Sequence, residues 1–153
     1  MKNADFSENS NFTESNKALV DILYSIPNII LIVNNKRELL FSNKSLNAIF
    51  EIDETELMGK LFGEVFNCVN AGNNSAGCGF AEGCELCGAF NAINDVIKTQ
   101  ESITKECRIL SNSKNKIIAY DLSVTVSPLF IEQNYYNLVT LNDISTTKRK
   151  KAL

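Results

Sequence analysis

The chain has 153 residues, 44% of them apolar and 22% charged, and a formal net charge of −3. This length suits one compact domain, and the composition excludes a disordered or collagen-like chain. The absence of histidine excludes His-dependent nucleophiles, His-ligated zinc and haem held by an imidazole, and no nucleotide-binding or metalloprotease motif is present, so we expect no enzyme activity.

The chain opens with a polar segment followed by an amphipathic one. Residues 1–14 are rich in Asn, Ser and acidic side chains and are expected to form a mobile tail, with the folded domain covering 15–147. Apolar residues then recur at three- and four-residue steps, which predicts a flanking helix that ends before Pro27. The expected apolar stripe consists of Leu19, Ile22, Leu23 and Ile26.

Two strands and short helices are expected next. The β-branched run from Ile29 to Val33 predicts a buried strand, and Asn34-Asn35 suits a tight turn into a second strand over 38–41. Ser42 or Asn43 can then cap a short helix over 46–50, and a turn over 53–56 precedes Gly59.

The second half of the chain predicts one longer helix and three strands. The helix carries an apolar stripe at spacings of four, three and four residues, formed by Leu86, Phe90, Ile93 and Ile97. The strands lie around 103–109, 119–126 and 136–141, with turns at 111–115 and 133–134. Two strands, helices and three further strands predict an α+β fold, a five-stranded antiparallel sheet with its helices on one side.

The sequence also bears on the compartment. Its longest apolar run, Ile29 to Val33, is far shorter than the roughly 20 residues of a membrane helix, and the N-terminus lacks an apolar signal segment. We therefore expect a cytoplasmic protein without a membrane partner, in which cysteines serve as thiols or metal ligands rather than disulfides. Since the chain is acidic overall, the basic residues at 148–151 are interpreted as the start of a signalling helix or linker over 148–153, not as a nucleic-acid surface.

Four short segments, in this order, resemble a PAS domain. They are Ile26-Pro27 before the first strand, the Asn43 region after the second, Glu56-Leu57-Met58-Gly59-Lys60, and Asp143-Ile144-Ser145 leading to Lys148. The resemblance covers about Ser15 to Lys150. It implies a five-stranded antiparallel sheet with a ligand pocket under its helices. It further implies signal sensing, often by a homodimer, with output through an effector such as a histidine kinase of a two-component system or a cyclase.

Glycine and cysteine are concentrated in one stretch. All seven glycines lie between Gly59 and Gly88, and four of the five cysteines follow the pattern C-x9-C-x5-C-x2-C. A two-residue gap lets two thiolates converge, and glycines let a short loop wrap closely and direct N–H groups at sulfur. The last two cysteines also lie at the start of the predicted longer helix, whose dipole favours negative charge. The expected soft-metal ligands are Cys68, Cys78, Cys84 and Cys87.

Three interpretations of these cysteines stay open. Irregular spacing and glycine wrapping favour an iron–sulfur cluster, [4Fe-4S] or [2Fe-2S], over structural zinc, which more often uses paired C-x2-C units. Some PAS sensors carry oxygen-labile iron–sulfur clusters, so the resemblance supports the same interpretation. Free thiols in a metal-free loop are the third option. Cys107 shares a strand face with Ile103 and Ile109 and is expected to be a core residue rather than a fifth ligand or redox partner.

Other PAS cofactors find less support. A flavin-binding light sensor would need an Asn-Cys-Arg context, but Asn67-Cys68 is followed by Val69. The leading hypothesis is therefore a cytoplasmic PAS sensor whose cluster reports oxygen or redox state and shifts the following helix. The second hypothesis is a PAS interaction and dimerisation module with structural zinc or a metal-free cysteine loop.

Overall fold

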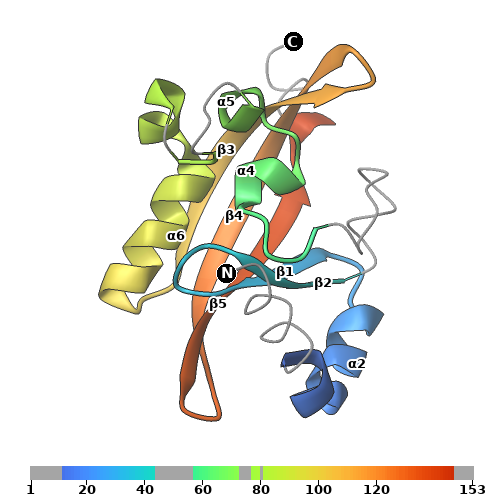
Figure 1. The fold of residues 1–153 in the computed structure, drawn as a ribbon, viewed down its shortest axis with the longest axis vertical. Coiled ribbons are helices and arrows are strands. Elements are labelled where there is room, and N and C mark those ends of the chain that lie inside the picture. The colour runs from blue at the N-terminus through green and yellow to red at the C-terminus, as the bar shows by residue number, and fades with distance from the viewer. Residues whose placement is uncertain (1–11, 44–56, 73–76, 80, 147–153) are drawn as a thin grey trace.

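The structure, a computed structural model, describes residues 12–43, 57–72, 77–79 and 81–146. Its centre is a five-stranded antiparallel sheet in the order β2-β1-β5-β4-β3, which confirms the predicted fold class (Figure 1). The strands are β1 (Ile29–Val33), β2 (Leu39–Ser42), β3 (Ile103–Ser113), β4 (Lys116–Ile131) and β5 (Asn134–Asp143). The helices are α2 (Lys17–Ser25), α4 (Phe62–Val65), α5 (Val69–Gly72), the 3-10 helix η2 (Glu82–Leu86) and α6 (Gly88–Thr99).

Two tight turns join the three C-terminal strands. Lys114 and Asn115 have φ of 49° and 64°, and Glu132 and Gln133 have φ of 48° and 67°. Two successive left-handed residues form the turn that matches the twist of a hairpin. The predicted turn over 111–115 was too long, because residues 111–113 stay paired with β4.

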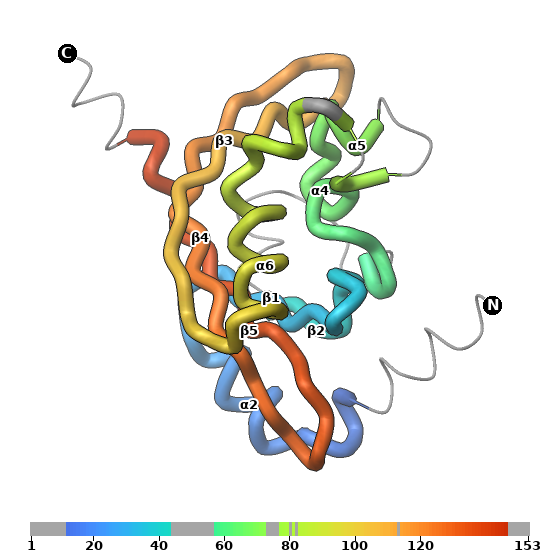
Figure 2. The backbone as a smooth tube through the Cα atoms, turned by 90° about the vertical axis from the view of Figure 1, so that its left-hand side faces the viewer, coloured from blue at the N-terminus to red at the C-terminus, as the bar shows by residue number. Residues whose placement is uncertain are grey.

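The inner face of the sheet holds the main core. Leu122, Val124 and Val126 of β4 point inward and are completely buried. Cys107 and Ile109 of β3 lie on the same face. Figure 2 shows α4, α5 and α6 on this side of β3 and β4.

The longer helix begins later than predicted. Leu86 does not belong to its apolar stripe: it lies in η2 and is 91% exposed. Cys87, with ψ of 119°, is extended and separates η2 from α6. The stripe that faces the sheet consists of Ala89, Ala92, Ile93 and Val96, whose small alanines bring α6 close to the strands.

The flanking helix α2 packs on the opposite face of the sheet, so the helices do not all lie on one side. Val20 and Leu23 contact a second cluster that includes Ile30 and Ile32, which explains why β1 is buried at every position. Ile22, predicted to lie in the apolar stripe, is instead 60% exposed. Phe12, inside the segment expected to be a tail, is buried in this cluster.

Asn43 connects α2 to the first strand. Its Oδ1 accepts from the Ile30 N–H at 3.0 Å, and its Nδ2 donates to the carbonyls of Leu23, Ile26 and Asn28. The helix predicted over 46–50, the turn over 53–56 and the basic residues at 148–151 lie outside the described residues. Within the described residues, no helix is long and apolar enough to span a membrane.

Candidate functional site

All five cysteines line one cavity of about 320 Å³. The cavity lies between the α4–α5 segment, η2, the start of α6 and strand β3. The structure therefore brings together the four predicted ligands Cys68, Cys78, Cys84 and Cys87, and adds Cys107 on the sheet.

Short backbone contacts position three of these cysteines. Cys68 directly precedes α5 and pairs with Ser111 of β3 in an isolated bridge. Cys84 lies in η2, and its carbonyl accepts from the Cys87 N–H at 3.1 Å, which closes the C-x2-C turn. Cys87 is the N-cap residue of α6, whereas Cys84, also expected at the start of the longer helix, lies in η2.

Cys78 is held by a close approach to α4. The backbone N–H of Gly63 donates to Cys78 Sγ at 3.2 Å. A Cβ on residue 63 would lie 2.9 Å from that sulfur, so glycine is the residue that permits this contact. No sequence motif marked Gly63 as part of the site.

Cys107 is a core residue, as expected, but it is also a neighbour of a predicted ligand. Its side chain is 4% exposed, and its Sγ lies 3.6 Å from Cys87 Sγ. This contact joins residues 20 positions apart in the chain, at the N-cap of α6 and on β3. The periodicity of β3 predicted the face on which Cys107 lies but not its partner.

The thiols differ strongly in acidity. The hydrogen bond with Cys107, together with the N–H groups of Phe90 and Ala89, lowers the pKa of Cys87 to about 6 against the effect of burial. The same hydrogen bond and burial raise the pKa of Cys107 far above its usual range. Burial raises the pKa of Cys78 to about 11 although Gly63 and Arg37 act in the opposite direction. In the absence of a metal, Cys87 is therefore the one of these three cysteines that is ionised near neutral pH.

Arg37 brings a positive charge to the cysteine loop from the β1–β2 turn. Its guanidinium lies 4.7 Å from the centre of the Phe90 ring, and its Nη1 donates to the Cys78 carbonyl at 3.4 Å. The apolar spacing placed Phe90 in the core-facing stripe of the longer helix, and no sequence pattern indicated Arg37. Together the two residues connect the loop to the hairpin and to the first turn of α6.

The kind of metal centre that these cysteines could hold depends on how their side chains are placed. Among the described residues, no three Cys, Asp or Glu side chains are placed to hold a single metal ion. A tetrahedral zinc site would need four sulfurs about 2.3 Å from one point. The cysteines instead line one cavity, and in a multi-iron group different irons would take different thiolates.

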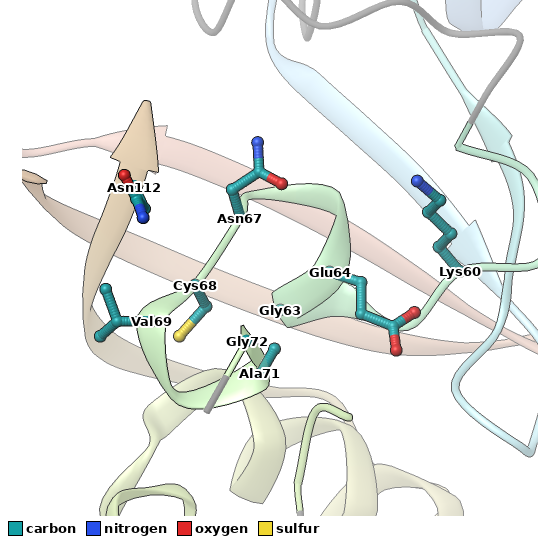
Figure 3. Close-up of a pocket in the computed structure, with 9 residues that line it drawn as sticks. All are labelled: Lys60, Gly63, Glu64, Asn67, Cys68, Val69, Ala71, Gly72 and Asn112. Atoms are coloured by element: carbon teal, nitrogen blue, oxygen red, sulfur yellow. The ribbon is translucent and has the colours of Figure 1, made fainter. Parts of the chain in front are cut away.

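A second, larger cavity of about 480 Å³ adjoins the first (Figure 3). Cys68, Gly63 and Ala71 line both cavities. Its remaining wall is mostly polar, with Lys60, Glu64, Asn67 and Asn112. It contains one cysteine only, so the smaller cavity is the candidate cofactor site.

Known structures resemble this fold, although no protein-family model and no curated protein matches the sequence. The PAS domain of nitrogen regulation protein NR(II) from Vibrio parahaemolyticus aligns with a TM-score of 0.57 and 13% identity over 82% of this chain and 96% of that one. A PAS domain from Colwellia psychrerythraea aligns with a TM-score of 0.58 and 13% identity, over 85% of this chain and 97% of that one. A PAS domain from a two-component sensor histidine kinase aligns with a TM-score of 0.55 and 10% identity, over 83% of this chain and 94% of that one. The chain therefore has the fold of PAS signal-sensing domains.

Proposed function

We propose that this chain is a cytoplasmic PAS sensor that binds an iron–sulfur cluster and reports oxygen or redox state. The proposed ligands are Cys68, Cys78, Cys84 and Cys87. The observation that carries the proposal is the convergence of these four cysteines, separated by up to eighteen residues of sequence, on one cavity of about 320 Å³.

The surroundings of the cavity support an anionic thiolate centre. The Gly63 N–H points at Cys78 Sγ, and the start of α6 presents N–H groups to Cys87. The guanidinium of Arg37 lies against the loop. Hydrogen bonds to sulfur and nearby positive charge both stabilise thiolates and tune the potential of such centres. When bound, the cluster supplies a redox-active group with iron that oxygen can attack.

The contacts of β3 suggest how a change at the cavity could reach the end of the domain. Arg108, next to Cys107, forms an ion pair with Asp121 of β4 at 3.0 Å. The Asp121 N–H donates to Ser145 Oγ, and its carbonyl accepts from the Ile144 N–H. Ile144 and Ser145 belong to the last of the four PAS-like segments, so Asp121 is a common partner of β3 and of this segment. We propose output from there to an effector such as a histidine kinase or cyclase, within a homodimer.

Anaerobic purification tests the cofactor directly. We expect a coloured protein with visible absorption, iron and acid-labile sulfide. Cys→Ser variants at positions 68, 78, 84 and 87 should each lose most of the bound iron. The matched control is Cys107→Ser, which should retain iron because it removes a cavity thiol outside the proposed ligand set.

The alternative is an interaction module whose cysteine loop holds structural zinc or no metal. A colourless protein with one zinc and no labile sulfide would replace the redox proposal with this one. Equal iron content in all five Cys→Ser variants would show that the iron does not bind in this cavity.

A further inference from the structure

Cys87 and Cys107 meet where the first turn of α6 touches β3. Their sulfurs are 3.6 Å apart, and among the described residues they are the one pair of cysteine sulfurs in hydrogen-bonding contact. The backbones of α6 and β3 are also in close contact here, since a Cβ on Gly88 would overlap the Glu106 carbonyl oxygen and lie 3.4 Å from the Cys107 Cα. Pairing with Leu122 fixes Cys107 within the sheet. The two thiols are thus adjacent because two packed elements hold them there.

We propose that Cys87 and Cys107 form a reversible disulfide when the cavity holds no metal centre, with hydrogen peroxide as the oxidant. A disulfide requires the sulfurs to approach to about 2.05 Å, a movement of roughly 1.5 Å. Cys87 can supply it, because its side chain is only partly buried, whereas Cys107 is enclosed in the core.

The chemistry balances in two steps. Sulfur of Cys87 attacks peroxide, an S–O bond forms as the O–O bond breaks, and the released hydroxide takes the thiol proton and leaves as water. Sulfur of Cys107 then attacks the sulfenic sulfur of Cys87, so that the S–S bond forms and a second water leaves. Two thiols together lose two electrons, and one peroxide becomes two waters.

The other cysteines are less suited to replace either partner. Cys78 Sγ accepts the Gly63 N–H on α4, on a different wall of the cavity. Cys84 precedes Cys87 in the C-x2-C turn, and its sulfur is not within hydrogen-bonding contact of another cysteine of the described chain. The geometry therefore selects one pairing among the five thiols.

The disulfide would control loading of the site, a consequence that rests on the proposed function. A sulfur in a disulfide is not a thiolate and cannot ligate iron. Oxidation of the empty site would therefore withdraw Cys87 from the ligand set until a thiol reductant restores it. Cys107 would then control binding of the cofactor through Cys87, although Cys107 is not one of its ligands.

The first experiment treats metal-free, reduced full-length chain with hydrogen peroxide and maps the peptides without reduction. We expect the peptide linking Cys87 to Cys107 to exceed every other pairing by severalfold and to disappear with dithiothreitol. Cys68→Ser, which removes a different cavity thiol, should preserve the link, and Cys107→Ser should abolish it. Predominance of another pairing, or a Cys107 that stays free while Cys87 is oxidised, would overturn the proposal. If circular dichroism shows that Cys107→Ser does not fold, the peptide maps of wild type and Cys68→Ser still test whether Cys87 and Cys107 form the main disulfide.

A second experiment separates this inference from the proposed function. After peroxide treatment and removal of peroxide, anaerobic reconstitution with iron and sulfide should load the wild type several times less than untreated wild type, and dithiothreitol should restore the loading. Equal loading of the oxidised and the untreated wild type would refute control by the disulfide. Failure of untreated, reduced wild type to bind iron would instead count against the iron–sulfur proposal and leave the peptide map valid.

Discussion

Replacing Gly63 with alanine tests whether Cys78 is packed against α4. The new Cβ would lie 2.9 Å from Cys78 Sγ and 3.2 Å from Cys78 Cβ, whereas carbon atoms in contact are usually about 3.5–4.0 Å apart. Overpacking of this kind costs about 1–3 kcal/mol, and alanine in a helix gains about 0.5–1 kcal/mol over glycine. We therefore expect Gly63→Ala to lower the free energy of unfolding by about 1 kcal/mol, because the loop must move away from α4.

Gly72→Ala is the matched control. Gly72 also lies in a short helix, but among the described residues no packing neighbour comes within 4 Å of the position of its Cβ. This variant should be as stable as wild type or gain up to about 1 kcal/mol. Urea unfolding of the reduced, metal-free proteins measures the difference, which should be about 1–2 kcal/mol with unchanged m-values. A Gly63→Ala protein as stable as Gly72→Ala would refute the packing of Cys78 on α4.

Three further predictions concern groups around the site and the fold. In metal-free protein, the rate at which iodoacetamide alkylates Cys87 should rise as the pH passes about 6, where its thiol ionises. Cys107→Ala should move this rise to higher pH. Peptide mass spectrometry after alkylation at several pH values measures both. Arg37→Ala should lower the free energy of unfolding in urea titrations by about 1 kcal/mol, because its contact with Phe90 is lost. Lys36→Ala, at an exposed position of the same turn, should change this free energy by less than about 0.5 kcal/mol. Asn43→Asp should cost about 3 kcal/mol or more in thermal or urea unfolding, because a buried carboxylate would face three carbonyl oxygens that now accept from Nδ2.

Each of these predictions has a clear contrary result. Unchanged alkylation in Cys107→Ala would mean that the two thiols are not hydrogen-bonded. Equal loss of stability in Arg37→Ala and Lys36→Ala would indicate a general charge effect instead of the specific contact. A normally stable Asn43→Asp protein would show that the amide does not connect α2 to β1.

The strands of this fold follow directly from local pattern. Along β4, the buried residues Leu122, Val124 and Val126 alternate with Ser123 and Thr125, as expected for a strand with one buried side. The strand ends were less accurate, because the pairing of residues 111–113 outweighs their turn-like composition. Helix α6 was misplaced at its start for a similar reason: the extended backbone at Cys87 ends the 3-10 turn, and apolar spacing alone does not register such a break.

The site was partly predictable from the sequence, because four clustered cysteines are chemically distinctive. Spacing indicated that Cys84 and Cys87 converge, since a two-residue gap forms one turn. It could not indicate Cys107, which reaches the cavity only through the packing of α6 on β3. Arg37 was invisible for the same reason: its contact with the Cys78 carbonyl spans 41 residues of chain.

The cysteines divide between the rigid core and the loop that covers it. Cys107 belongs to the main core cluster, and Cys68 and Cys87 pack against it. Cys78 and Cys84 belong to neither apolar cluster of the described residues, although both are buried. Polar contacts secure Cys78 instead, namely the Gly63 N–H to its sulfur and the Arg37 guanidinium to its carbonyl, and Cys84 is held by backbone hydrogen bonds with Ala81 and Cys87. A segment held by few apolar contacts opens at lower free energy than a core strand. The proposed metal centre would therefore order or release Cys78 and Cys84 while the sheet stays folded, which is the property that a local switch on a stable domain requires.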